Sequence, residues 1–272
     1  MGDSQLRTLL QRSDFEVIPL KGTIGKVAAL PPGSSVTVTA SPSKGMKATV
    51  DLALQLQDHG FRAVPHISAR LVEDQQALAS MIKRLDAGGV TQAFVTGGDG
   101  EPLGDYFDAG SLLRDMADLG HPFLDVGITG YPEGHPVISD HLLLKALLDK
   151  QGFATYAVTQ MCFNARTILD WVSRIRDRGV RLPIRVGIPG AVHPTRLLTM
   201  SAKIGVGDSI RYLAKNRGIY RLLRPGAYHP DRLIKSIAAK AESHAVTGIH
   251  LFTFNQLEST AAWHRRLLTR QN

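Results

Sequence analysis

The chain has 272 residues, of which 43% are hydrophobic and 21% charged, and a formal net charge of +8. A chain of this length buries a sizeable core without a covalent staple. Its single cysteine, Cys162, excludes an intrachain disulfide and a thiolate metal cluster. No apolar run approaches the roughly 18 residues of a membrane span, and residues 1–12 are polar and amphipathic rather than signal-like. We therefore expect a cytoplasmic protein, folded as a single domain over residues 1–272.

Basic residues concentrate in the C-terminal third. From Ala191 onward there are 13 basic and four acidic residues, whereas the preceding part is nearly neutral. This asymmetry favours an anionic partner, such as a phosphate or a polycarboxylate, but it also fits helices with a solvated basic face. Aromatic residues make up only 6% of the chain and form no evident stacking platform, so we expect neither nucleic acid nor a membrane as partner.

Short apolar runs alternate with amphipathic stretches along the whole chain. Eight runs of five or six residues predict strands buried on both faces of a parallel sheet. In order, they are Phe15–Pro19, Ser35–Thr39, Arg62–Ile67, Gln92–Thr96, Leu124–Thr129, Thr155–Thr159, Ile184–Ile188 and Gly248–Thr253. Between them, helical spacing and capping residues predict helices over Glu73–Gly88 and Asn164–Gly179. This alternation predicts an α/β fold, a (β/α)8 TIM-type barrel.

One interval breaks the alternation. Between the seventh and eighth predicted strands, glycines and prolines punctuate helical segments, which predicts a helical insertion over residues 191–247. The insertion follows the seventh strand, on the face where barrel enzymes build their sites, and it contains most of the basic surplus.

Polar residues that follow the predicted strands resemble those of the methylenetetrahydrofolate reductase family. Phe15-Glu16-Val17-Ile18-Pro19 is similar to that family's Phe-Glu-x-x-Pro, and Tyr131-Pro132-Glu133-Gly134-His135-Pro136 is the most specific match. Four shorter pieces follow in the family's order: Val38-Thr39, Pro65-His66-Ile67, Gly98-Asp99 and Thr159-Gln160. The resemblance extends from Phe15 to Leu257 and implies the family's barrel fold and its reductase activity.

Glu16 is the candidate general acid. Opening the folate ring requires a proton donor for the departing nitrogen, and burial of a carboxyl group favours its protonated form. Phe15 and Val17 give Glu16 apolar neighbours in a barrel strand. The alternative is a glutamate paired with a buried arginine or lysine. The family's catalytic glutamate matches Glu16, which favours the acid.

The resemblance assigns folate contacts to polar residues after other strands. Asp99 and Gln160 match positions that hydrogen-bond the pterin and organise the reductant, and Asp99 joins Glu16 as a candidate catalytic residue. Phe252 and Gln256 are further candidates at the end of the eighth strand. Three of these four have a structural alternative: a turn for Asp99, a backbone hydrogen bond for Gln160, and inward packing for Phe252.

A second group of residues matches positions that contact the family's flavin. These are Thr39, His66, Gly98, Tyr131, His135 and Lys150, the last by alignment with a phosphate-binding lysine. His66 and His135 come from different strands, with only Glu133 near either in sequence, so we expect no metal site.

The flavin pattern is incomplete. The family usually has an arginine two residues before the aspartate, where this chain has Gly97. It has a small residue where this chain has Phe107, which we expect to fill space that a cofactor would use. The family's Asp-Leu-Leu-Asn helix motif is not reproduced over residues 140–145. FAD remains possible by resemblance but is disfavoured, because losing these groups removes several charge-assisted hydrogen bonds.

These features together predict NAD(P)H-dependent reduction of 5,10-methylenetetrahydrofolate to 5-methyltetrahydrofolate, a reaction of one-carbon metabolism and methionine biosynthesis. NADH would deliver its hydride directly or through weakly bound flavin. The partners would be the folate and the nicotinamide nucleotide, for a monomer or a homodimer. A folate-binding methyl-transfer or demethylation protein, or a non-catalytic folate-binding barrel, is the alternative.

Overall fold

The computed structural model describes residues 2–193 and 230–269, with side chains from Ser4 onward. Eight parallel strands close into a barrel in chain order, as the sequence predicts. They are β1 (Ser13–Val17), β2 (Ser35–Val38), β3 (Arg62–Ser68), β4 (Gln92–Thr96), β5 (Asp125–Gly130), β6 (Tyr156–Thr159), β7 (Ile184–Pro189) and β8 (Val246–Phe252). The barrel closes between β1 and β8, where Glu16 is in register with Phe252.

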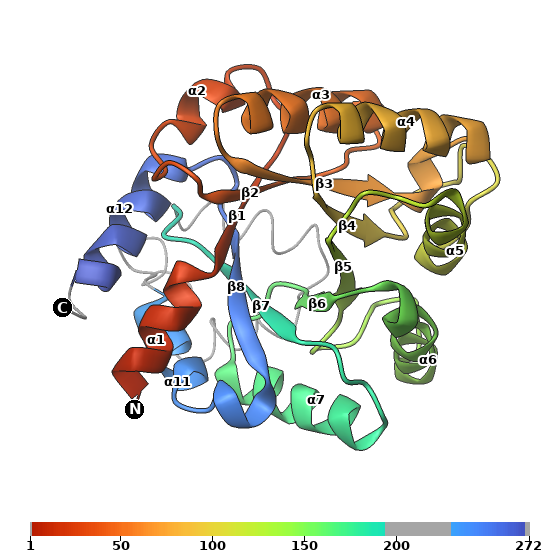
Figure 1. Ribbon diagram of the computed structural model, residues 1–272. Coiled ribbons are helices and arrows are strands. Elements are labelled where there is room, and N and C mark those ends of the chain that lie inside the picture. Colours follow the sequence, from red (N-terminus) through yellow and green to blue (C-terminus); the bar gives the residue numbers. More distant parts are fainter. Residues whose placement is uncertain (1, 194–229, 270–272) are drawn as a thin grey trace.

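Helices surround the barrel, and the N- and C-terminal segments lie on the same side of it (Figure 1). The α-helices are α1 (Gly2–Gln11), α2 (Thr23–Val27), α3 (Gly45–Asp58), α4 (Gln75–Ala87), α5 (Ala109–Leu119), α6 (Asp140–Lys150), α7 (Ala165–Asp177), α11 (Asp231–Ala238) and α12 (Leu257–Thr269). Three short 3-10 helices join them: η1 (Ala69–Leu71), η2 (Gln151–Phe153) and η3 (Glu242–His244). None of these described helices is both long and apolar enough to span a membrane.

The capping residues explain why the predicted helices begin where they do. Asp74 accepts a hydrogen bond from the backbone N–H of Ala77 and starts α4. Asn164 caps α7 by accepting from the N–H groups of Arg166 and Thr167. The first strand differs slightly from its prediction. It ends at Val17 rather than Pro19, because the chain turns there with Leu20 N–H bonded to the Ile18 carbonyl.

The apolar core has two parts. Side chains on the outer face of the strands pack against the helices in one continuous cluster, which includes Phe15, Val36 and Ile67. A smaller cluster fills the interior of the barrel with Val64, Phe94, Tyr156 and Val158. This alternation is what a period of two predicts for barrel strands. Polar side chains occupy the interior on either side of that smaller cluster, towards the amino-terminal and the carboxyl-terminal ends of the strands.

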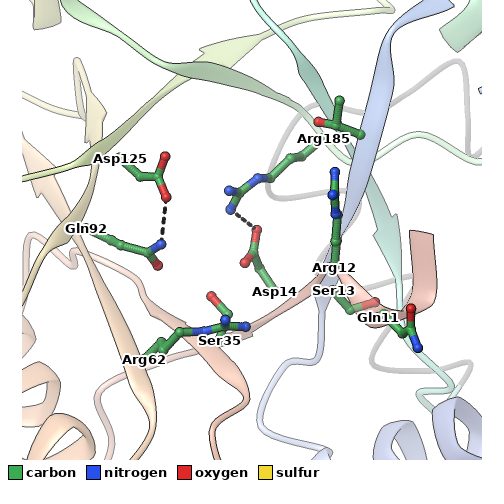
Figure 2. A pocket seen from close by; sticks show the side chains of 10 residues that line it. Gln11, Arg12, Ser13, Asp14, Ser35, Arg62, Gln92, Asp125 and Arg185 are labelled. Atoms are coloured by element: carbon green, nitrogen blue, oxygen red, sulfur yellow. Dashed lines mark hydrogen bonds and ion pairs between the residues drawn. The ribbon is translucent and has the colours of Figure 1, made fainter. Parts of the chain in front are cut away.

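The amino-terminal mouth of the barrel contains a polar pocket lined by residues at or next to the starts of the strands (Figure 2). Within it, Arg185 donates to Asp14 at 2.8 Å, and Gln92 donates to Asp125 at 2.8 Å. The Arg185 guanidinium also lies 3.7 Å from the centre of the Tyr156 ring. Barrel enzymes place their chemistry at the opposite, carboxyl-terminal mouth, so this ionic network is a stabilising feature of the fold.

The connection between β7 and β8 lies mostly outside the described residues. Of the predicted insertion over residues 191–247, the structure describes α11, η3 and their flanking residues. The cations Arg196, Lys203, Arg211, Lys215, Arg217, Arg221 and Arg224 fall in the part that is not described. The assignment of residues 191–247 as a helical insertion within a single domain therefore stays a prediction.

Candidate functional site

Glu16 lies inside the barrel on β1, and its side chain is buried. Its Oε2 is 3.1 Å from Nε2 of His250, a residue of β8 that is 2% exposed. The sequence offered a buried arginine or lysine as the alternative partner, and the described partner is this histidine instead. A histidine nitrogen can act as a hydrogen-bond donor or as an acceptor. The pairing is therefore compatible with an ionised or a protonated Glu16, whereas a permanent cation would favour the ionised form alone.

His66 lies beside this pair. It comes from β3, is buried, and its ring centroid is 6.1 Å from that of His250. Burial, with the neighbouring His250 charge as a second cause, holds the pKa of His66 well below its ordinary 6.5. His66 is therefore neutral near pH 7. We call Glu16, His66 and His250 the carboxylate–imidazole cluster.

Aromatic rings frame the carboxylate–imidazole cluster. Phe94 packs at 4.6 Å from His66 between ring centroids, and Phe252 meets His250 nearly edge-on at 5.0 Å. Phe252 is thus engaged in the inward packing that was its structural alternative, while its ring remains partly exposed. Each histidine therefore packs against a ring from its own strand or from the neighbouring strand.

Several polar atoms around the carboxylate–imidazole cluster lack a partner among the described residues. They are Thr37 Oγ1, His66 Nε2 and His250 Nδ1, and all three are buried. Thr37 is directly in register with Glu16 on the adjacent strand. Buried polar groups are nearly always satisfied in native proteins, so this layer of the barrel is suited to hold a polar or charged guest.

Hydrogen bonds from the segment after β8 fix the carboxyl-terminal end of β1, the strand that carries Glu16. Thr253 donates its hydroxyl to the Glu16 carbonyl at 2.5 Å. The Asn255 side chain accepts from the Ile18 N–H at 2.8 Å and donates to the Ile18 carbonyl at 3.0 Å. Asn255 adopts a left-handed conformation with φ of 60°, which asparagine tolerates better than most residues. These two side chains therefore help to fix the position of the Glu16 backbone along the barrel axis.

A second group of predicted residues gathers above β4 and β5. Burial raises the pKa of the Tyr131 phenol, and the charge of Asp99 adds to the effect, which puts Asp99 near Tyr131. Tyr131 in turn meets His135 edge-on, with 5.2 Å between ring centroids. Asp99 is exposed in a turn between two glycines of positive φ, as its structural alternative predicted. The Asp99 side chain is therefore accessible from solvent.

Gly98 is the glycine that this turn requires. Its φ is 90°, and a Cβ at this position would lie 2.0 Å from the Ser68 hydroxyl oxygen. Both the backbone conformation and the close approach to β3 exclude a side chain here. Gly98 therefore brings the backbone of the loop after β4 against the end of β3, next to Asp99.

The remaining candidates take part in hydrogen bonds with other residues of the chain. Gln160 Oε1 accepts from the adjacent Met161 N–H at 2.8 Å, the backbone bond that its alternative interpretation predicted. Gln256 Oε1 accepts from the His193 N–H at 2.6 Å and so ties the end of β8 to the loop after β7. The Thr39 carbonyl accepts from the Thr49 hydroxyl. None of these bonds uses every polar atom of its side chain, so each residue keeps a group that a ligand could take.

Lys150 occupies a different environment. It ends α6 and is buried against the start of α5, where a Cβ on Gly110 would be 3.9 Å from its Cγ. Burial lowers its pKa, and the charge of Asp108 opposes that shift. The structure thus gives Lys150 a role in joining two helices, and its ammonium has an acidic neighbour in the chain itself.

Two positions at which the sequence departs from the flavin resemblance are open or exposed. A Cβ at Gly97 would meet nothing within 4 Å, and Phe107 is 64% exposed. Phe107 therefore does not fill the interior of the barrel. Sequence reasoning missed Arg70, whose guanidinium donates to the carbonyls of Gly100 and Phe107 and ties η1 to the loop after β4. That cation is committed to backbone carbonyls.

The comparisons with known proteins agree with this architecture. The sequence profile of the family described as methylenetetrahydrofolate reductase matches residues 19–205. Methylenetetrahydrofolate reductase 1 of Schizosaccharomyces pombe is 33% identical over 86 residues, which is 29% of this chain and 14% of that protein. The chain thus matches only a small part of this relative's length.

A solved structure is similar over nearly the whole chain. An apo-form of a putative deoxyribose-phosphate aldolase from Toxoplasma gondii covers 99% of this chain and 97% of its own, with a TM-score of 0.52 and 12% identity. At this identity the likeness shows the fold alone.

Fold and site together define a (β/α)8 barrel with a buried carboxylate at the mouth where such barrels carry their chemistry. Because the family profile spans more than half of the residues, the chain belongs to the methylenetetrahydrofolate reductase family, a family of oxidoreductases.

Proposed function

We propose that this protein reduces 5,10-methylenetetrahydrofolate to 5-methyltetrahydrofolate, with NAD(P)H as the electron source. The observation that carries the proposal is Glu16, a buried carboxyl group in the interior of a barrel of this family, paired with His250 at 3.1 Å. The reaction consumes one proton and one hydride. The nicotinamide supplies the hydride, so a residue of the chain must donate the proton.

Glu16 supplies the proton. It protonates the folate nitrogen that leaves when the five-membered ring opens, and the ring carbon becomes an iminium carbon on the other nitrogen. Hydride from the nicotinamide then adds to that carbon and forms the methyl group. Glu16 regains its proton from solvent, with His250 as the neighbour that holds the carboxylate in place.

The loops after β4 and β6 would hold the pterin. Asp99 offers two carboxylate acceptors for the pterin's N–H groups, and Gln160 retains its amide nitrogen as a donor. Gln256 and Phe252 stand at the end of β8, on the side of the mouth nearest Glu16 in the barrel order. The pterin would thus lie across the mouth, between the Asp99 turn and the end of β8.

The described residues favour direct hydride transfer over a flavin relay. Thr39, His66, Tyr131 and His135 could face a flat ring, but the groups for a flavin's phosphates do not fit. Position 97 carries no cation, and the buried Lys150 ammonium has Asp108 as its acidic neighbour. Each missing charge-assisted bond removes about 1.5–3 kcal/mol of binding free energy.

The experiment is a turnover assay with the purified chain, combined with flavin quantification after denaturation. We expect NADH or NADPH to be consumed only when methylenetetrahydrofolate is present, with one 5-methyltetrahydrofolate formed per nucleotide oxidised. We expect a colourless protein that releases no stoichiometric flavin. Folate binding without turnover would contradict the reductase and favour a non-catalytic folate-binding barrel. One flavin per chain would restore the two-step relay.

A further inference from the structure

The carboxylate–imidazole cluster has the donor set of a transition-metal site. One ligand atom each from Glu16, His66 and His250 lies within 4.8 Å of the other two, and all three residues are buried. Two imidazole nitrogens and a carboxylate oxygen are the three protein ligands of one common type of catalytic zinc site. Glu16 lies on β1, His66 on β3 and His250 on β8. The barrel closes between β1 and β8 and so brings the first and the last strand together.

The spacing needs little adjustment to surround an ion. Zinc binds nitrogen and carboxylate oxygen at about 2.0–2.2 Å, so neighbouring ligand atoms in a tetrahedral site are roughly 3.3–3.6 Å apart. Glu16 Oε2 and His250 Nε2, at 3.1 Å, are already close to that separation. The widest separation in the carboxylate–imidazole cluster is at most 4.8 Å, which exceeds that range by little more than an ångström.

The unsatisfied atoms supply an independent reason to expect a guest here. His66 is 6% exposed, and its Nε2 is buried without a hydrogen-bond partner among the described residues. A nitrogen lone pair left this way loses the hydration it has in the unfolded chain. A bound cation restores an interaction for that lone pair and neutralises the charge of the buried carboxylate. Thr37 Oγ1, also unpartnered in the described structure, stands beside Glu16 on β2 and could bond to a water on the ion.

We propose that Glu16, His66 and His250 form a binding site for a divalent transition-metal ion such as Zn²⁺, and that this ion occupies the Glu16 carboxylate that the proposed reaction uses. Two nitrogens and one oxygen suit zinc and its neighbours, whereas magnesium and calcium require six or more oxygen ligands. The ion would leave Glu16 unable to donate a proton, so it would inhibit ring opening. This second clause rests on the proposed function, while the binding itself rests on the geometry alone.

The binding test uses the full chain, stripped with a chelator and titrated with Zn²⁺ in a calorimeter and with Co²⁺ in a visible spectrometer. We expect one tight site per chain and the strong visible bands of a four- or five-coordinate Co²⁺. His66→Gln and His250→Gln should each weaken binding by about 100-fold or more, since loss of even an outer-shell partner of a metal site typically costs 10–100-fold.

The matched control is His264→Gln. His264 is also a buried histidine, but its Nε2 faces the Leu10 carbonyl at 2.8 Å and it takes no part in the carboxylate–imidazole cluster. Its substitution should leave metal binding unchanged. Circular dichroism of all variants checks that they remain folded. The absence of a tight site in the wild type would overturn the proposal. Undiminished binding in both cluster variants would also overturn it, because the bound metal would then be an adventitious surface cation only.

An activity arm separates this inference from the proposed function. If the chain reduces methylenetetrahydrofolate, stoichiometric Zn²⁺ should inhibit the wild type and a chelator should restore it. If the chain has no reductase activity, the calorimetric and Co²⁺ measurements still decide whether the site exists. Turnover that is unaffected by a stoichiometrically bound ion would refute the claim that the ion occupies the Glu16 carboxylate.

Discussion

Glu16 has a single described side-chain partner, and that partner is a histidine from the last strand. A carboxyl group held this way is positioned without being neutralised by a permanent cation, as a general acid requires. The backbone of the same residue is fixed by the Thr253 hydroxyl. The position of Glu16 thus depends on β8 through both its side chain and its carbonyl.

Glu16→Gln tests the acid directly. The substitution keeps the shape of the side chain but removes the transferable proton, so kcat should fall by about 10²–10⁴-fold while folate affinity is retained. The measurements are steady-state turnover and equilibrium folate binding. Glu242→Gln, at an exposed carboxylate of η3, is the matched control and should behave as wild type. Turnover of the Glu16 variant within about threefold of wild type would clear this residue of the role.

His264 links the fold to pH. Burial lowers its pKa from the ordinary 6.5, the Leu10 carbonyl opposes the shift and Arg265 adds to it. Below its unfolded pKa the unfolded chain therefore binds a proton that the folded chain does not, and the free energy of unfolding falls as pH decreases. His264→Gln should flatten this dependence below about pH 6.5, as measured by urea unfolding at a series of pH values. An unchanged slope would show that His264 titrates alike in both states.

At the scale of elements, the sequence was most informative where local chemistry decides. The eight strands were predictable because apolar runs buried on both faces look alike in any parallel barrel. Asp74 and Asn164 were readable as helix caps because their side chains bond only two or three residues ahead. The end of the first strand was less readable, since a turn and a strand compete over the two residues after Val17.

Contacts across the barrel closure were beyond the sequence. His250 lies in a run that reads as an ordinary strand, and its distance of 234 residues from Glu16 carries no local signal. Only the register between β1 and β8 brings them together. Arg70 was missed for a similar reason, because its partners are carbonyls in another loop. The family resemblance named Glu16, but the chain's periodicity could not name its partner.

Gly98 tests the turn after β4. Gly98→Ala forces a side chain into a backbone of φ 90° and against the Ser68 hydroxyl, so the free energy of unfolding should fall by about 1–3 kcal/mol. The KM for folate should also rise, because Asp99 moves with the turn. Gly97→Ala is the matched control, since its Cβ would meet nothing within 4 Å. Equal stability of the two variants by chemical unfolding would remove the requirement for glycine at position 98.

The basic segment before β8 supports one prediction from sequence alone. Folates carry carboxylates on their glutamate tail, and exposed ion pairs contribute only about 0.2–1 kcal/mol each. Neutralising Arg217, Arg221 and Arg224 together should raise the KM for polyglutamylated folate or NADH several-fold with kcat little changed, and salt should shrink the effect. A triple variant that matches wild type for both substrates at low salt would mean a solvated basic surface. These three residues lie outside the described part of the chain.

At the scale of the whole molecule, the two mouths of the barrel differ in chemistry. The amino-terminal mouth carries complete ion pairs, such as Arg185 with Asp14 (Figure 2). The interior nearer the other mouth leaves Thr37, His66 and His250 with unsatisfied atoms around Glu16. Closed barrels divide stability and function between their ends in this way. Unsatisfied side-chain atoms also occur at the amino-terminal mouth, on Ser35 and Gln92, so the feature that distinguishes the other end is its buried carboxylate with two imidazoles beside it.

In the proposed reaction, hydride passes from the nicotinamide directly to the folate carbon inside this barrel. The most direct test follows a deuterium label from the transferred position of NADH into the product. We predict 5-methyltetrahydrofolate whose methyl group carries one deuterium without loss to solvent, formed by protein that contains no flavin. A flavin relay would expose the label to exchange with water at the reduced flavin. No labelled product, or a label diluted by solvent hydrogen, would contradict direct transfer.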